Sequence, residues 1–106
     1  MDPALVDRLE KLTAAGIEFV AIPGLTRYYV LARDGFAALV ERTGSGFGGI
    51  GAAGQVSDRG FAALIWRGQT PVFAGKNFEI PATPEDVERL RLFASDLENA
   101  LTIQDV

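Results

Sequence analysis

The clearest motif that could bind a ligand is the run of glycines between positions 44 and 54. They fit the spacing G-x-G-x-x-G three times, starting at Gly44, Gly46 and Gly49. Backbone N–H groups in glycine turns can line a phosphate site. The dinucleotide-binding form of this motif needs a helix after the loop, but a strand pattern follows here. We therefore expect a Gly-rich loop, either a plain connection or a cradle for a phosphate or nucleotide. The candidate ligand-binding residues are Gly46, Gly48, Gly49, Gly51, Arg59 and Lys76.

Two short stretches resemble signatures of known families. Residues 49–56 resemble the glycine loop of protein kinases, which would imply nucleotide binding between two strands. The kinase catalytic-loop histidine and the Asp-Phe-Gly motif are absent from the sequence. Residues 59–66 resemble the longer signature of RNA-recognition-motif domains, whose fifth position is an aromatic residue that stacks on a base. That position is Ala63, and the net charge of −4 disfavours nucleic acid, so neither resemblance predicts a function.

The composition excludes several kinds of chemistry. The chain has no cysteine and no histidine, which rules out thiolate nucleophiles, imidazole bases and cysteine zinc sites. A metal could be held only by carboxylates, and no cluster of acidic residues indicates such a site. Asp58 is the one loop acid near the glycines, but its spacing from Ser57 and Lys76 indicates no catalytic group. The sequence therefore favours a non-enzymatic role and predicts no cofactor.

Length and charge suit one small domain, residues 1–106. The N-terminus lacks the pattern of a signal peptide, and no apolar run is long enough to span a membrane, so a cytoplasmic location is expected. Residues 27–76 hold six basic and three acidic side chains, whereas residues 79–106 hold seven acidic and two basic ones. This asymmetry indicates either attraction within the chain or a sheet that binds anions.

Helices are predicted at both ends of the chain. Asp2 suits an N-cap, Pro3 the first helical position and Gly16 a left-handed helix end. The second helix is predicted to begin after the N-cap Thr83, with Asp86 at the capping-box position. Its apolar stripe predicts packing on a sheet or, alternatively, a helix–helix dimer seam. The stripe consists of Val87, Leu90, Ala94, Leu97 and Leu101.

Alternating and β-branched segments between the helices predict strands. Asp34-Gly35 is a strong signal for a two-residue hairpin turn. We therefore predict an α+β fold with a mainly antiparallel meander of about five strands and both helices on one sheet face. The expected strands are residues 17–22, 27–33, 36–43, 61–67 and 70 to about 80.

A similarity between two segments of the chain predicts which side chains share a sheet face. Residues 35–42 resemble residues 60–67, so both strands are expected to place the same positions towards the core. The predicted core positions are Phe36, Ala38, Val40, Phe61, Ala63 and Ile65. The opposite face would then carry the apolar residues Leu39, Leu64 and Trp66. A sheet face that is exposed to water should instead carry polar residues.

The apolar second face leads to the functional prediction. It is expected to be covered either by the Gly-rich segment or by another chain, unless Trp66 is a core residue of its own subunit. The sequence thus predicts a small binding or assembly module that forms a homodimer, or binds another protein, through Leu39, Leu64 and Trp66. Neither nucleic acid nor a membrane is an expected partner.

Overall fold

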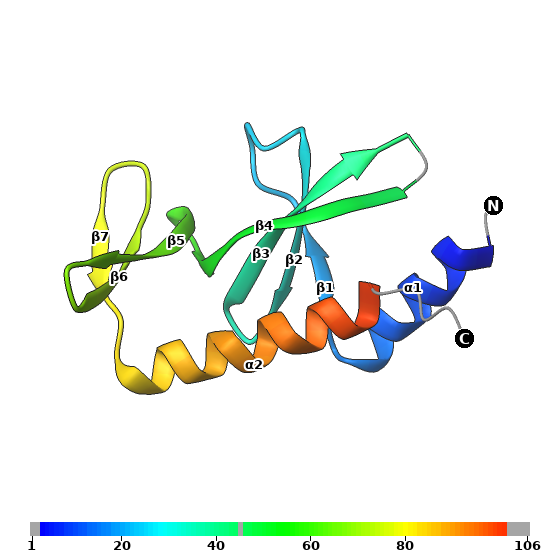
Figure 1. Cartoon of the computed structure of the whole chain (residues 1–106). Coiled ribbons are helices and arrows are strands. Elements are labelled where there is room, and N and C mark those ends of the chain that lie inside the picture. Colours follow the sequence, from blue (N-terminus) through cyan, green and yellow to red (C-terminus); the bar gives the residue numbers. More distant parts are fainter. Residues whose placement is uncertain (1–2, 45, 102–106) are drawn as a thin grey trace.

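Seven strands form one antiparallel sheet in a computed structural model, which describes residues 3–44 and 46–101 (Figure 1). Each strand pairs only with strands adjacent to it in sequence, in the order β1 to β7. A helix precedes the sheet and another follows it, which confirms the predicted α+β class. The elements are α1 (Pro3–Ala14), β1 (Glu18–Val20), β2 (Tyr28–Arg33), β3 (Phe36–Thr43), β4 (Gly46–Ser57), β5 (Gly60–Arg67), β6 (Thr70–Ala74), β7 (Glu79–Pro81) and α2 (Pro84–Leu101).

The ends of the helices follow the local sequence. At the start of α2, the Asp86 N–H donates to Thr83 Oγ1 and the Thr83 N–H donates to Asp86 Oδ2, both at 3.0 Å. This reciprocal pair is the predicted capping box. After α1, Gly16 adopts a φ of 75° and the Ile17 N–H donates to the Leu12 carbonyl at 2.9 Å. These bonds end the helix as predicted. The predicted N-cap Asp2 lies outside the described residues.

Both helices cover the same face of the sheet, which we call the inner face. Leu12 of α1 packs in one buried cluster with Phe93 and Leu97 of α2 and with Val40 and Phe73 of the sheet. Figure 1 shows α2 running along this face. The apolar stripe of α2 therefore packs on its own sheet, which favours the first of the two predicted uses. The opposite face is called the outer face.

The sheet has seven strands where about five were predicted, because two segments were misassigned. The Gly-rich segment is not a loop: most of it lies within β4, which pairs with β3 from Thr43↔Gly46 to Phe36↔Gln55. Its register shifts on both sides of Val40, which indicates β-bulges. The segment predicted as one strand over 70–80 is divided into β6 and β7 by a turn.

The predicted faces of β5 are wrong. Residues directly opposite one another share a face, and Phe36 lies opposite Gln55, which lies opposite Ala62. Ala62 therefore joins Phe36 on the inner face, and Phe61 lies on the outer face. The similarity between the two segments predicted the wrong faces for β5 because the register of β5 is shifted by one residue from the expected one. A shift of one residue moves every side chain of a strand to the opposite face of the sheet.

Candidate functional site

The outer face over β2 and β3 is covered by the chain itself. Ile22 and Leu25, in the connection between β1 and β2, pack against the buried residues Val30, Ala32 and Ala37. In Figure 1 this connection rises on the side of the sheet away from α2. The outer face over β2 and β3 therefore needs no cover from the Gly-rich segment or from another chain, the two covers that were predicted.

The outer face over β5 and β6 carries apolar side chains that are only partly buried. Its cross-strand pairs are Ala63↔Ala74 and Ile65↔Val72, with Phe61 next along β5. All five side chains are apolar and only partly buried. Apart from Phe61, they belong to neither of the two apolar clusters of the protein. We call these five residues the outer patch, and it is the candidate functional surface because partly exposed apolar patches commonly mark interfaces.

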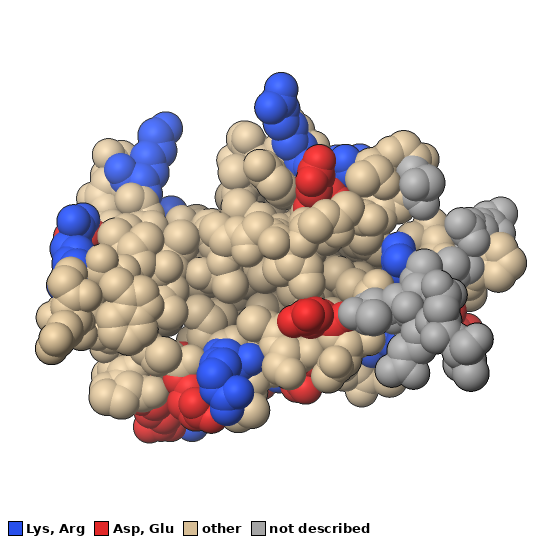
Figure 2. All heavy atoms as spheres, viewed as in Figure 1, with Lys and Arg blue, Asp and Glu red and all other residues tan. Residues whose placement is uncertain are grey.

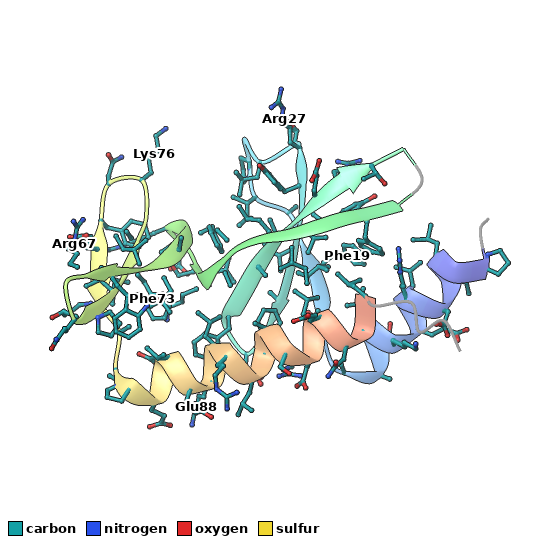
Figure 3. All side chains as sticks on the ribbon, viewed as in Figure 1. Phe19, Arg27, Arg67, Phe73, Lys76 and Glu88 are labelled. Carbon is teal, nitrogen blue, oxygen red and sulfur yellow. The ribbon has the colours of Figure 1, made fainter. Side chains whose placement is uncertain are left out.

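Cations stand above the outer face on both sides of a hollow. Figure 3 shows Lys76, in the turn between β6 and β7, and Arg27, before β2, both pointing away from α2. In the space-filling view of Figure 2 these two segments form separate projections with blue tips, and the surface between them is hollowed and tan. In this view the hollow therefore has an uncharged floor and positive charge on its margins.

Nine of the ten cations in the described residues fall into two groups, and the tenth, Arg8, is half-buried. Five have a carboxylate within ion-pair distance, in the pairs Lys11–Asp7, Arg33–Asp96, Arg67–Glu79, Arg89–Glu85 and Arg91–Glu88. Four exposed cations in the described residues have no carboxylate partner: Arg27, Arg42, Arg59 and Lys76. Two of these four, Arg27 and Lys76, tip the projections beside the hollow, so their charge is available to a partner.

The predicted ligand-binding residues do not form one site. The Arg59 guanidinium lies 5.4 Å from the centre of the Phe78 ring, and Phe78 shares a turn with Lys76, so these two cations are brought to the same end of the sheet. The glycines lie elsewhere: Gly46 packs near Leu5 of α1, and Gly48 is close to Glu41 and Thr43. Gly49 and Gly51 lie between them and the middle of β4.

The predicted interface residues are also separated. Leu39 lies on the outer face, partly buried against the β2–β3 cluster, whereas Leu64 packs on the inner face against the main core. Trp66 follows Leu64 by two positions, so the pleat places both on the same side of β5. Trp66 is 58% exposed, the most open of the large apolar side chains described. The predicted common face is therefore wrong, while the exposure of Trp66 leaves it available as a contact.

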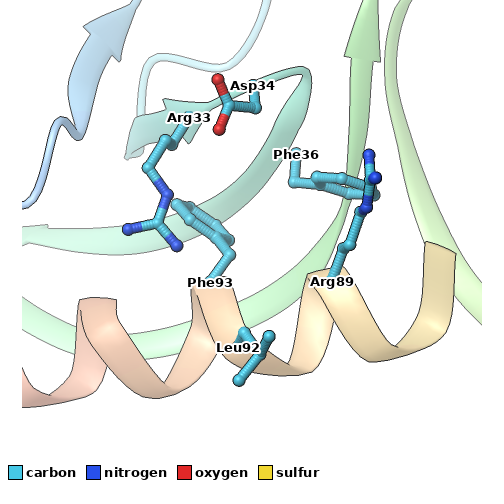
Figure 4. Close-up of a pocket in the computed structure, with 6 residues that line it drawn as sticks. All are labelled: Arg33, Asp34, Phe36, Arg89, Leu92 and Phe93. Carbon is cyan, nitrogen blue, oxygen red and sulfur yellow. The ribbon is translucent and has the colours of Figure 1, made fainter. Parts of the chain in front are cut away.

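A shallow pocket of about 390 Å³ lies between the β2–β3 turn and α2 (Figure 4). Arg33 lies beside the ring of Phe93 on one side of the pocket, and Arg89 lies beside the ring of Phe36 on the other. Arg33 pairs with Asp96 at 2.9 Å and donates to the Ala15 carbonyl at 3.1 Å. Arg89 is paired with Glu85 within α2. Both guanidinium charges are therefore already compensated, and Arg33 serves to join the hairpin to both helices rather than to hold an anion.

The titratable groups of the described chain do not indicate a second functional site. Hydrogen bonds from Arg91 lower the pKa of the Glu88 carboxyl, but both side chains are exposed on α2 and line none of the pockets described. Within residues 3–44 and 46–101, no group of three or more acidic side chains is placed to hold a metal ion. None of the described helices is both long and apolar enough to cross a membrane.

Comparison with models of known protein families found no match, and comparisons with curated proteins and with solved structures found none either.

Proposed function

We propose that the chain is a non-enzymatic binding and assembly module that self-associates through the outer patch. The observation that carries the proposal is the uncovered apolar surface of β5 and β6. Ala63, Ile65, Val72 and Ala74 are only partly buried and belong to neither apolar cluster, although nearby parts of the outer face are covered by the chain's own loop. Covering this surface on association would remove apolar area from water. Leu39, over β3, and Trp66, on the inner-face side of β5, lie outside the outer patch, and the exposed Trp66 remains a predicted contact.

Replacing Ile65 by glutamate is expected to weaken self-association at least tenfold, because a charge would then have to be buried in the contact. The mass of wild type and variant would be followed by light scattering and sedimentation over a range of concentrations. Gln69→Glu is the matched control, since it adds the same charge in the adjacent β5–β6 turn, where the side chain is exposed. A wild type that stays monomeric at tens of micromolar would contradict the proposal.

A second candidate function, binding of a phosphate or nucleotide ligand, is favoured by one observation. Arg59 and Lys76 lie at the same end of the sheet, and neither has a carboxylate partner among the residues that the structure describes. The Arg59 guanidinium is held over the Phe78 ring at 5.4 Å from its centre. Two cations so placed could bind one phosphoryl group. The glycines of β4 take no part in this version of the site.

Phosphate binding predicts that millimolar inorganic phosphate or nucleoside triphosphate raises the melting temperature, because a ligand bound only by the folded state stabilises it. The double variant Arg59→Ala, Lys76→Ala is expected to lose most of that rise. Arg27→Ala is the control, since Arg27 is also an exposed cation with no carboxylate partner in the described part of the chain but belongs to a different loop. Equal responses of the double variant and wild type would count against this site.

A further inference from the structure

The strand β4 has an open edge in the middle of the sheet. It is the longest of the seven strands, and its two neighbours do not cover it equally. Its pairing with β3 begins at Gly46, but its pairing with β5 covers only residues 54–57. Figure 1 shows β5 leading away from β4 towards the end of the molecule opposite α1. Within the described residues, the part of β4 before Gly54 therefore has a strand partner on one side only.

The exposure of residues 49–52 shows that this edge is open to solvent. All four are exposed, and two of them are glycines, whose accessible surface is mostly backbone. A Cβ added at Gly49 would meet nothing within 4 Å. Ile50 lies directly opposite Val40, yet Val40 is 0% exposed whereas Ile50 is 39% exposed. Burial is thus lost within one strand spacing, as expected where no further strand follows β4.

The chemistry of the open edge indicates the kind of partner that fits it. An unpaired strand edge presents a row of backbone N–H and C=O groups, which another extended strand can satisfy. Natural edge strands are often protected from such pairing by charged residues or proline. Residues 46–56 contain neither. The two bulges of β4 bend the strand but leave residues 49–52 exposed.

A second copy of β4 matches this edge. Two identical strands can pair antiparallel about a two-fold axis, with the same surface of both copies in contact. Because residues 46–56 are uncharged, the two edges bring no like charges together, whereas a charged peptide would find no counter-charge on this strand. An axis perpendicular to the sheet allows a residue to lie opposite itself. Placed at Ile50, it pairs two exposed apolar side chains, and such cross-strand pairs stabilise a sheet.

We infer that two copies of the chain pair antiparallel through the open edge of β4, with Ile50 opposite Ile50 of the second copy. The strands β1 to β4 of both copies then form one continuous sheet. The outer patch lies on β5 and β6 and takes no part in this contact. The inference therefore goes beyond the proposed function and does not depend on it.

The main test uses the absence of cysteine from the sequence. In Ile50→Cys the two cysteines would lie directly opposite, with Cα atoms about 4.5–5.5 Å apart, which a disulfide can bridge. Ala52→Cys is the matched control, since it is an exposed position of the same strand. In this register its two cysteines would be offset by about four residues, or roughly 13 Å. Under mild oxidation, Ile50→Cys is expected to form the covalent dimer at least tenfold faster.

Hydrogen exchange of the wild type provides a second measurement that does not depend on the folding of a variant. The backbone amides of residues 46–53 are expected to exchange more slowly at high than at low protein concentration, because pairing gives them acceptors. Ile50→Lys should abolish this difference, since it would place two lysines together at the axis. Gln69→Lys is its control, because it adds the same charge in the exposed β5–β6 turn. Equal exchange of the wild type at both concentrations would overturn the inference.

The outcomes separate this contact from the proposed function. Ile65→Glu alters the outer patch and is expected to leave the cross-linking rate of Ile50→Cys unchanged. If Ile50→Cys cross-links no faster than Ala52→Cys while the wild type associates, the β4 contact is overturned and the proposed function stands. If Ile50→Cys cross-links rapidly while Ile65→Glu has no effect on association, the proposed function fails and the β4 contact stands.

Discussion

Replacing Gly54 by alanine is expected to destabilise the fold by about 3 kcal/mol or more, towards or beyond the upper range for overpacking. A Cβ atom at this position would collide with the carbonyl oxygen of Ala62 and lie 2.8 Å from the Cα atom of Ala63. Both neighbours are backbone atoms of β5, so no side-chain rotation relieves the collision. The substitution must therefore separate β4 from β5, whose pairing joins the two halves of the sheet.

Gly49→Ala in the same strand is the matched control. An added Cβ there meets nothing within 4 Å, and the backbone is not in the left-handed region. We expect its stability to stay the same or rise by up to about 1 kcal/mol, because alanine restricts the unfolded chain. Urea unfolding of both variants, followed by circular dichroism, gives the comparison. Equal stabilities for the two variants would show that the close approach of β4 and β5 is not required.

Replacing Phe93 by alanine is expected to cost about 3–5 kcal/mol, the usual loss when a buried aromatic side chain is removed. Phe93 is 1% exposed and packs in the main cluster between α2 and the sheet. Its ring also lies 5.6 Å from the Arg33 guanidinium, so a cation–π contact would be lost as well. Since domains of this kind are stable by about 5–15 kcal/mol in total, this loss removes a large share of the stability.

The next residue in the chain provides the comparison for Phe93. Leu92→Ala removes an apolar side chain of similar type but half exposed, and is expected to change the free energy of unfolding by no more than about 0.5 kcal/mol. Thermal and urea unfolding measure both changes under the same conditions. Similar losses for Leu92→Ala and Phe93→Ala would contradict the placement of α2 on the sheet.

Local signals predicted the helices and several turns. Thr83 and Asp86 specify the start of α2 through two short-range hydrogen bonds, and Gly16 specifies the end of α1. Asp34 and Gly35 both have positive φ, as the predicted two-residue turn requires. These features depend on residues only a few positions apart, so the sequence contains the information needed to recognise them.

The errors arose where structure depends on distant residues. Glycine density around Gly54 favours a loop by local propensity, but the residue is glycine because β5 approaches it closely, which only the pairing reveals. The face of Ile65 depends on the register set by the turn between Ser57 and Gly60. The turn alone places Phe61 opposite Val56, and only the bulged register of β3 on β4 then assigns Phe61 to the outer face.

The strictly sequential order of the strands bears on how the chain folds. Each hairpin can form from neighbouring segments, which favours rapid early pairing. By contrast, α1 packs against α2, and these helices come from opposite ends of the described chain. Closing so long a segment is entropically costly before the contact forms. Docking of the helices is therefore expected to come last, and until then a partly formed sheet would leave Phe73 and its inner-face neighbours open to solvent, a species prone to aggregation.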